Sequence, residues 1–291
     1  MTAGPFRSFL FTPGNHSRKV AKVFGAGADG AILDLEDAVA LDEKEGTRAP
    51  TVEALKRPRD CLGYIRVNAA DTEFCSGDLS AVVGPWLDGI VLPKVESAAD
   101  LQSVDSEVGG LEREQGMEPG TVDILPIIET AKGLDAVSSI AGCGSRVRRL
   151  SFGAVDFAKD LGLRLTPDEW ETIPARSAIV LASRVAGLEP PIDSVFVRYR
   201  DTEGLKKSTE RTRDLGFQGR FCIHPGQVGP VNEVFTPTEE EVATAEKIIA
   251  AFADAEAAGS ASISVDGFFV DYPVVEQARR TVELSKIIRG G

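Results

Sequence analysis

Short runs of apolar residues recur along the chain, and a polar or charged residue follows each of them. Runs of this length are typical of buried β-strands. The runs, with the residues that follow them, are Phe9–Phe11 before Thr12, Pro13, Gly14 and Asn15; Ala31–Leu35 before Glu36 and Asp37; Tyr64–Ile65 before Arg66; Ile90–Leu92 before Lys94; Ile124–Ile128 before Glu129; Leu150–Val155 before Asp156; Ser194–Val197 before Arg198; and Phe221–Ile223 before His224. The pattern predicts eight strands, each with a functional group at its carboxyl end.

Segments long enough for a helix separate most of these strands. The predicted helices are 15–26, 42–56, 98–114, 130–141, 167–186 and 202–215, with Thr166 as a candidate N-cap of the fifth. Alternating strands and helices favour a parallel sheet. Eight such units in 291 residues favour an α/β protein with the TIM (β/α)8 barrel fold, which typically takes about 250 residues. The polar residues at the strand ends are expected to converge on one face.

The pattern changes beyond the eighth strand. Thr236 or Thr238 is expected to cap a helix that opens with acidic residues. Farther on, Asp266-Gly267 has the composition of a hairpin turn between two short apolar strands, and a final helix is expected over 274–288. The end of the chain is therefore predicted to be a hairpin-plus-helix extension.

We divide the chain into two parts on this basis. Residues 1–235 are expected to form the (β/α)8 barrel and to be the catalytic domain, and residues 236–291 to form the C-terminal helical or lid extension. The extension is either a lid or arm that reaches a neighbouring subunit, or an appendage whose role is only to pack against the barrel. The sequence leaves both interpretations open.

Composition and charge limit the class of protein. Apolar residues make up 43% of the chain and charged residues 26%, which is typical of a soluble globular protein. A net charge of −13 disfavours binding to nucleic acid. The chain has no apolar run of about 18 residues, so no membrane span is predicted. The N-terminus lacks the apolar core of a signal peptide. We therefore expect neither a nucleic-acid partner nor a membrane partner.

The cysteine and histidine content indicates the redox state of the thiols and argues against some kinds of catalytic site. The four cysteines have no C-x-x-C spacing, so we expect reduced thiols and a cytoplasmic location. Only two histidines are present, which argues against a zinc site built on several histidines. No G-x-S-x-G elbow of a serine hydrolase occurs.

Two of the strand-end residues are acids on successive strands, Glu129 and Asp156. An ionised carboxylate at a buried strand end is costly unless it is paired or bound to a metal. Magnesium typically takes one or two carboxylates and fills its remaining positions with water and substrate. The alternative is that the two acids cap helices or pair with basic residues.

Taken in order, several motifs resemble the citrate lyase β-subunit-like branch of the HpcH/HpaI aldolase/citrate lyase superfamily. The matching segments are 7–15 (RSFLFTPGN), 33–39 (LDLEDAV), 66–68 (RVN), 92–96 (LPKVE), 127–133 (IIETAKG), 152–157 (FGAVDF) with 160–162 (DLG), and 216–217 (GF) with 222–225 (CIHP). The match covers nearly the whole chain.

This resemblance implies a fold, a cofactor and an activity. It implies a TIM barrel that assembles as a homo-oligomer, a trimer or a dimer of trimers, with Mg²⁺ held by Glu129 and Asp156. Arg66 is expected to face the substrate. Relatives cleave or form a carbon–carbon bond in a 3-hydroxyacyl-CoA such as citryl-, citramalyl- or malyl-CoA. Asp271 resembles an aspartate that enters the site of a neighbouring subunit from a C-terminal arm.

Retro-Claisen cleavage gives each of these residues a possible task. Bound magnesium would act as a Lewis acid, and Glu36 and Asp37 could hold its waters. Arg66 could stabilise the enolate, with pairing to Glu36 as the structural alternative. Asp271 could donate the final proton.

The remaining candidates concern substrate binding. Pro13, Asn15 and Arg18 are candidate ligands of the CoA phosphates. Lys94 is expected to bind substrate or to form an ion pair, and the alternative is a Schiff-base nucleophile.

Two other functions compete with the acyl-CoA lyase. The first is a metal-dependent aldolase that releases pyruvate from a 4-hydroxy-2-oxo acid. Such an aldolase would use the metal in the same way but would not need CoA. The second is a non-catalytic acyl-CoA-binding subunit on an inherited barrel. The C-terminal Asp271 favours the lyase over the aldolase, and the acids and arginine together argue against loss of catalysis.

Overall fold

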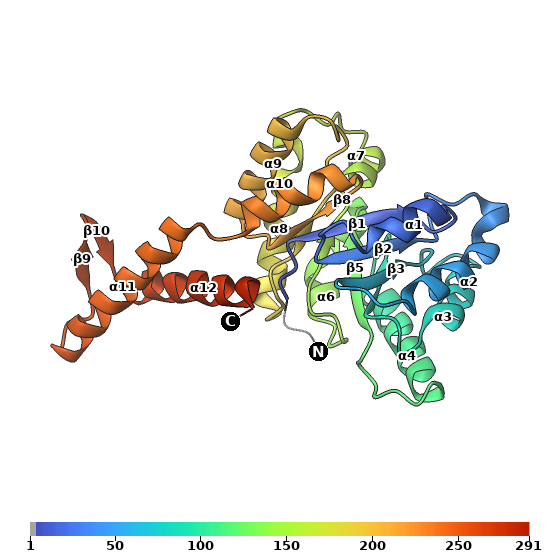
Figure 1. The fold of residues 1–291 in the computed structure, drawn as a ribbon, viewed down its shortest axis with the longest axis horizontal. Helices are drawn as coiled ribbons and strands as arrows, with labels where there is room; N and C mark the ends of the chain where they lie inside the picture. The colour runs from blue at the N-terminus through green and yellow to red at the C-terminus, as the bar shows by residue number, and fades with distance from the viewer. Residues whose placement is uncertain (1–3, 291) are drawn as a thin grey trace. The chain divides into compact units, whose positions relative to one another are not determined.

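Eight parallel strands close into a barrel in chain order, within a computed structural model that describes residues 4–290 (Figure 1). The strands are β1 (Ser8–Pro13), β2 (Gly30–Asp34), β3 (Leu62–Arg66), β4 (Gly89–Leu92), β5 (Asp123–Ile128), β6 (Ser151–Phe152), β7 (Ile192–Asp193) and β8 (Gly219–Cys222). The barrel is closed by pairing between β1 and β8. The predicted TIM (β/α)8 barrel is therefore confirmed.

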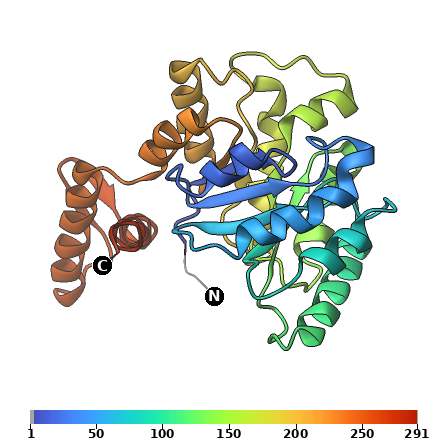
Figure 2. The same cartoon turned by 45° about the vertical axis from the view of Figure 1, so that its right-hand side comes forward.

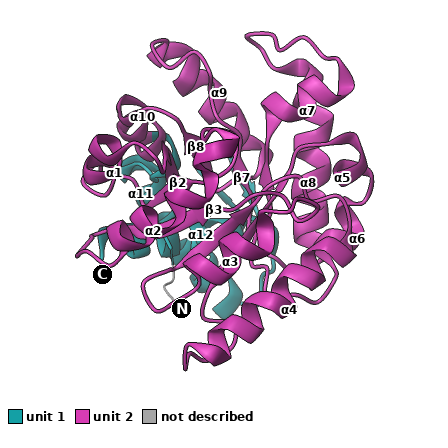
Figure 3. Ribbon diagram, turned by 90° about the vertical axis from the view of Figure 1, so that its right-hand side faces the viewer, with its two compact units in different colours: residues 1–5, 234–291 teal, residues 6–233 magenta. Residues whose placement is uncertain are grey.

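Helices surround the strands, as the view in Figure 3 shows. They are α1 (Ser17–Val23), α2 (Lys44–Leu55), α3 (Cys75–Val82), α4 (Ala98–Glu114), α5 (Ala131–Asp135), α6 (Val137–Ala141), α7 (Ala154–Leu161), α8 (Ile173–Val185), α9 (Thr202–Leu215) and α10 (Pro225–Phe235), with short 3-10 turns η1 (Leu41–Glu43) and η2 (Trp170–Thr172). Helices α4 and α9 have the predicted bounds. Side-chain caps from Ser97 and Asp201 fix their first turns.

Apolar side chains from most of the strands meet in one core cluster. Phe9, Ile32, Tyr64 and Phe221 belong to it, and the rings of Phe9 and Tyr64 meet edge to face with centroids 5.3 Å apart. Gly30 leaves space for this packing, because a Cβ at that position would lie 2.5 Å from the ring of Phe9. The buried core fixes the strand ends above it, where the functional groups lie.

Some predicted boundaries are wrong in two adjacent strands. The sixth strand ends at Phe152 and does not continue to Val155, because Gly153 leaves the strand conformation and becomes the N-cap of α7. The seventh strand is Ile192–Asp193, so the predicted strand 194–197 lies beyond it. Apolar runs in both places gave no sign of where strand pairing stops.

The helix predicted over 167–186 also starts later than expected. It begins with η2 and continues as α8, with Thr172 at the N-cap position. Thr166 does not cap the helix; its N–H and hydroxyl donate to the carboxylate of Glu171, at 2.6 and 2.8 Å. The predicted helix 130–141 is divided into α5 and α6.

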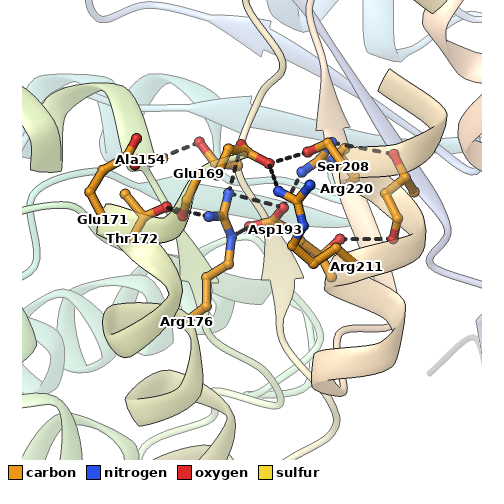
Figure 4. A network of polar contacts seen from close by, with 12 residues as sticks. Ala154, Glu169, Glu171, Thr172, Arg176, Asp193, Ser208, Arg211 and Arg220 are labelled. Carbon is orange, nitrogen blue, oxygen red and sulfur yellow. Dashed lines mark hydrogen bonds and ion pairs between the residues drawn. The ribbon is translucent and has the colours of Figure 1, made fainter. Parts of the chain in front are cut away.

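A buried polar network links β7 and β8 to the helices outside them (Figure 4). Asp193, at the end of β7, forms ion pairs with Arg176 of α8 and Arg220 of β8, and all three side chains are buried. Arg176 also reaches Glu169, which forms a further ion pair with Arg211 of α9. These contacts fasten α8 and α9 to the barrel wall.

The described chain separates into two compact units, Phe6–Glu233 and a smaller one that contains the described residues before Phe6 and those from Val234 onward, drawn in two colours in Figure 3. The smaller unit contains α11 (Glu239–Ala257), β9 (Ile263–Val265), β10 (Phe268–Val270) and α12 (Tyr272–Arg289). In Figure 2, α12 is seen nearly end-on beside α11, with which it packs. The predicted hairpin-plus-helix extension is confirmed.

Local sequence explains the form of this extension. Thr238 and Glu241 form a reciprocal capping box at the start of α11. The hairpin turn is made by Asp266 and Gly267, both with positive φ, as the two-residue turn requires. Phe252 of α11 joins Val270 in a separate small core.

Two further sequence expectations can be compared with the structure. All four cysteines are free thiols, and Cys75 and Cys222 are buried. Across residues 4–290, no helix has the length and apolar character that a bilayer crossing requires.

Candidate active site

Arg66 and Asp34 form the first part of the site, at the ends of neighbouring strands. The two residues are paired in the register of β2 and β3. The guanidinium of Arg66 donates from Nε and Nη2 to the two carboxylate oxygens of Asp34, at 2.7 and 2.6 Å. This two-pronged contact fixes the plane of the guanidinium. Asp34 was not among the predicted site residues, although its place at the end of β2 was a usable signal.

Glu36 lies between two basic side chains. It is buried and forms ion pairs with Arg66, at 2.9 Å from Nη1, and with the ammonium of Lys94. Burial raises the pKa of Glu36, and the charge of Arg66 acts in the opposite direction. The structural alternative in which Arg66 pairs with Glu36 is therefore present in the structure.

Lys94 is a charged ammonium in this environment. Its Nζ also lies 3.5 Å from Oδ1 of Asp37, which is largely exposed. Burial lowers the pKa of Lys94, but contact with Glu36 outweighs it and the net shift is upward. A Schiff-base lysine needs a lowered pKa, so this environment argues against that alternative.

The backbone of Lys94 connects this group to Glu129. Lys94 has a φ of 51°, an uncommon conformation for a residue other than glycine. Its N–H donates to Oε1 of Glu129 at 2.8 Å, while its side chain extends to Glu36. Lys94, in the loop after β4, therefore contacts Glu36 through its side chain and Glu129 through its backbone.

Glu129, just after β5, is a buried carboxyl with an unusual affinity for protons. Its side chain is nearly inaccessible to solvent. Burial and, next, the negative charge of Asp156 raise the pKa of Glu129 to about 8. Gly153 permits a close approach, because a Cβ there would lie 2.4 Å from Oε2 of Glu129.

Asp156 approaches Glu129 from a helix, and not from the strand end that the sequence predicts. It lies in the first turn of α7 and not directly after a strand. The N–H of Gly153 donates to the carbonyl of Ile128 at 3.0 Å, which joins the start of this helix to the end of β5. The two acids predicted as metal ligands are thus near enough for the charge of Asp156 to raise the pKa of Glu129.

The donor set fits a hard divalent cation. Within residues 4–290, neither Glu129 nor Asp156 takes part in an ion pair with a basic side chain. In the same part of the chain no group of three or more histidine, cysteine, aspartate or glutamate side chains is placed to hold a metal. A pair of carboxylates suits magnesium, which fills its remaining positions with water and substrate, better than zinc.

The three residues predicted to hold CoA phosphates have different surroundings. Pro13 ends β1 and is paired with Asp34. Asn15 donates to Oε2 of Glu43 at 2.6 Å and lines a cavity of about 480 Å³ between α1 and α2. Arg18 is exposed on α1. Of the three, Pro13 belongs to the strand ends that carry Asp34 and Arg66, and all three roles stay predictions.

Asp271 belongs to the smaller unit, whereas the other candidate residues belong to the barrel unit. It is the N-cap of α12, and its Oδ1 accepts a long hydrogen bond, 3.5 Å, from the N–H of Val274. Its predicted role in proton transfer stays a prediction.

A parallel (β/α)8 barrel with an arginine and a carboxylate at its strand ends, and a second carboxylate in the first turn of the helix after β6, is typical of metal-assisted enzymes. Residues 7–225 match the family model described as HpcH/HpaI aldolase/citrate lyase. The chain therefore belongs to this family of lyases, as the resemblance in its motifs predicted.

Curated relatives match over nearly the whole chain. A citrate lyase subunit beta from Leuconostoc mesenteroides subsp. cremoris is 37% identical, over 96% of this chain and 93% of the relative. A (3S)-malyl-CoA thioesterase from Cereibacter sphaeroides is 37% identical, over 98% of this chain and 96% of the relative. Two relatives with different named activities are thus equally similar in sequence.

A solved structure extends the similarity to three dimensions. CitE from Mycobacterium tuberculosis, in complex with magnesium, acetoacetate and coenzyme A, superposes with a TM-score of 0.77 at 27% identity. The match covers 96% of this chain and 97% of the CitE chain. The barrel fold and the extension are therefore shared along almost the entire length.

Proposed function

We propose that this protein is a magnesium-dependent carbon–carbon lyase that cleaves or forms a 3-hydroxyacyl-CoA. The observation that carries the proposal is the pair formed by the buried Glu129 and the half-buried Asp156. Each raises the cost of charging the other, and no ion pair to a basic side chain is found for either within residues 4–290, so a bound cation would balance their charge.

The relatives indicate the class of substrate. CitE from Mycobacterium tuberculosis binds magnesium, coenzyme A and a short oxo acid, and one relative acts on malyl-CoA. Citryl-, citramalyl- and malyl-CoA are the substrates that we assign for testing. Each would yield acetyl-CoA and a 2-oxo acid on cleavage.

Glu129 and Asp156 would hold the magnesium ion. When bound, magnesium supplies a Lewis acid that polarises the hydroxyl and carboxylate oxygens of the substrate. Arg66 keeps its positive charge at any working pH. Its contact with Asp34 orients it in advance toward the negative charge that develops on the thioester oxygen.

The remaining residues would handle water, protons and the carrier. The scissile bond breaks with its electron pair passing to the thioester enolate, the substrate hydroxyl loses a proton, and the enolate carbon gains one. We assign to Glu36 and Asp37 the ordering of the water that removes the hydroxyl proton. Asp271 of a neighbouring subunit is our candidate donor to carbon.

Substrate binding and assembly complete the proposal. Lys94 would bind the substrate carboxylate, while Pro13, Asn15 and Arg18 would contact the CoA moiety. A role for Asp271 in trans requires a homo-oligomer, and we propose a trimer or a dimer of trimers. Four free cysteines are consistent with our expectation of a cytoplasmic enzyme.

The test is product analysis with purified protein and Mg²⁺. Citryl-, citramalyl- and malyl-CoA are offered separately, and acetyl-CoA and the 2-oxo acid are quantified by mass spectrometry. Their appearance in equal amounts supports the lyase. Release of free CoA with an intact hydroxy acid would instead show thioester hydrolysis.

Two controls address the competing functions. Cleavage of 4-hydroxy-2-oxo acids alone would refute the acyl-CoA lyase and favour the aldolase. Acyl-CoA binding without turnover of any candidate would favour a non-catalytic subunit. Glu96→Gln is a matched control for Glu129→Gln, because Glu96 is a nearby glutamate that pairs with Lys132.

A further inference from the structure

Helix α7 carries Asp156, and contacts at two positions along α7 hold it in place. The N–H of Ala154, its first residue, donates to the hydroxyl oxygen of the buried Ser194, just after β7, at 2.8 Å. Near its end, Oδ2 of Asp160 accepts from the N–H of Ala131 at 2.7 Å. Figure 4 shows Ala154 at the edge of the polar network that surrounds Asp193.

The second contact connects the two segments that carry the metal-binding acids. Asp160 follows Asp156 by four residues, so both lie on the same side of α7. Ala131 follows Glu129 by two residues and opens α5. A hydrogen bond to a carboxylate, among the stronger kinds in proteins, therefore joins one acid's segment to the other's, in addition to the backbone bond from Gly153 to Ile128.

The position of Asp160 separates this role from a general stabilising one. Asp160 is exposed, and within the described residues it forms no ion pair. Its negative charge also lies near the carboxyl end of α7, where an anion is unfavourable for the helix. Removing this carboxylate should therefore leave the helix at least as stable by itself.

We propose that Asp160 is a positioning residue that sets the separation of Glu129 and Asp156 for a divalent cation. This inference rests on the proposed function, because it takes Glu129 and Asp156 as the metal ligands. The carboxylate touches neither metal nor substrate in this account. It acts by holding α7 against the segment that follows β5.

Calorimetric titration of the metal-free protein with Mg²⁺ tests the proposal without any assay of activity. Asp160→Ala is expected to weaken Mg²⁺ binding by about 10-fold, as loss of a residue that orients a ligand typically does. Asp160→Asn keeps an acceptor oxygen for the N–H of Ala131 and should bind Mg²⁺ close to wild type. Lys159→Ala, the exposed neighbour on α7, is the matched control.

Thermal unfolding of the same variants identifies a merely structural effect. The melting temperature of Asp160→Ala is expected to stay within about 2 °C of wild type, since surface changes are usually small in free energy. Unchanged Mg²⁺ affinity in Asp160→Ala, alongside lost affinity in Glu129→Gln, would overturn this inference alone. Unchanged affinity in Glu129→Gln would overturn the proposed metal site and this inference with it.

Discussion

Two buried carboxyl groups in the same barrel have pKa values that are shifted in opposite directions. Asp193 is completely buried, and burial alone would raise its pKa, but Arg176 and Arg220 lower it below the ordinary value. Glu129 is almost as buried, yet burial and Asp156 raise its pKa to about 8. The first carboxylate has its counter-charges within the fold. The second has no ion pair to a basic side chain within the described residues, and we propose that a bound divalent cation supplies its counter-charge.

The largest effect, on the free energy of unfolding, is expected from disrupting the ion pairs of Asp193. Asp193→Asn leaves Arg220 without its carboxylate partner inside the protein. Loss of one partner from a buried ion pair costs about 3–5 kcal/mol. Urea unfolding should show a decrease of this size in the free energy of unfolding. Asp168→Asn, an exposed acid nearby, is the control, and a loss below about 1 kcal/mol in Asp193→Asn would contradict the structural role.

The next effect concerns Arg66, the cation at the mouth of the barrel. Arg66→Lys keeps the charge but loses the two-pronged contact with Asp34. Removing a well-placed electrostatic donor slows such chemistry by about 10²–10³-fold. Steady-state kinetics should show this loss in kcat, with Arg184→Lys as an exposed control. An Arg66→Lys enzyme that turns over at the wild-type rate would remove Arg66 from the mechanism.

A smaller effect is the pH dependence of stability, which is expected to have opposite signs for Glu129 and Asp193. The folded-state pKa of Glu129, about 8, lies above its ordinary value of 4.5, so the folded protein binds this proton more tightly than the unfolded chain does. The resulting stability is fully present below pH 4.5 and is lost as pH rises through 8. In chelator at pH 9, Glu129→Gln should therefore be more stable than wild type.

The pH series provides the control for this prediction. At pH 5 wild-type Glu129 is protonated, so Glu129→Gln and wild type should have similar free energies of unfolding. Urea unfolding at pH 5 and pH 9 measures both. Equal destabilisation of the variant at the two pH values would show that Glu129 is held by the fold in the same way as Asp193.

Much of this site follows from sequence periodicity. Arg66 ends β3 and Glu129 follows β5, because short apolar runs mark the buried strands and polar residues mark their ends. The hairpin at Asp266-Gly267 is specified by local turn chemistry. These features depend on neighbours in the chain, so the sequence is sufficient to predict them.

Other features depend on contacts between distant segments. The run before Asp156 does not reveal that its second half starts a helix, since a buried strand and a buried helix start are equally apolar. The role of Asp34 requires the register between β2 and β3. The bridge from Lys94 to Glu129 depends on a positive φ that the local sequence gives no reason to expect.

The central claim is that Glu129 and Asp156 bind a divalent cation, and calorimetric titration with Mg²⁺ at pH 7 tests it most directly. Because the pKa of Glu129 is about 8, its proton must leave when the metal binds. Titrations in buffers of different ionisation enthalpy should show one bound Mg²⁺ and release of about one proton. Glu129→Gln should lose this binding and Glu96→Gln should keep it. Wild-type affinity in Glu129→Gln would contradict the account.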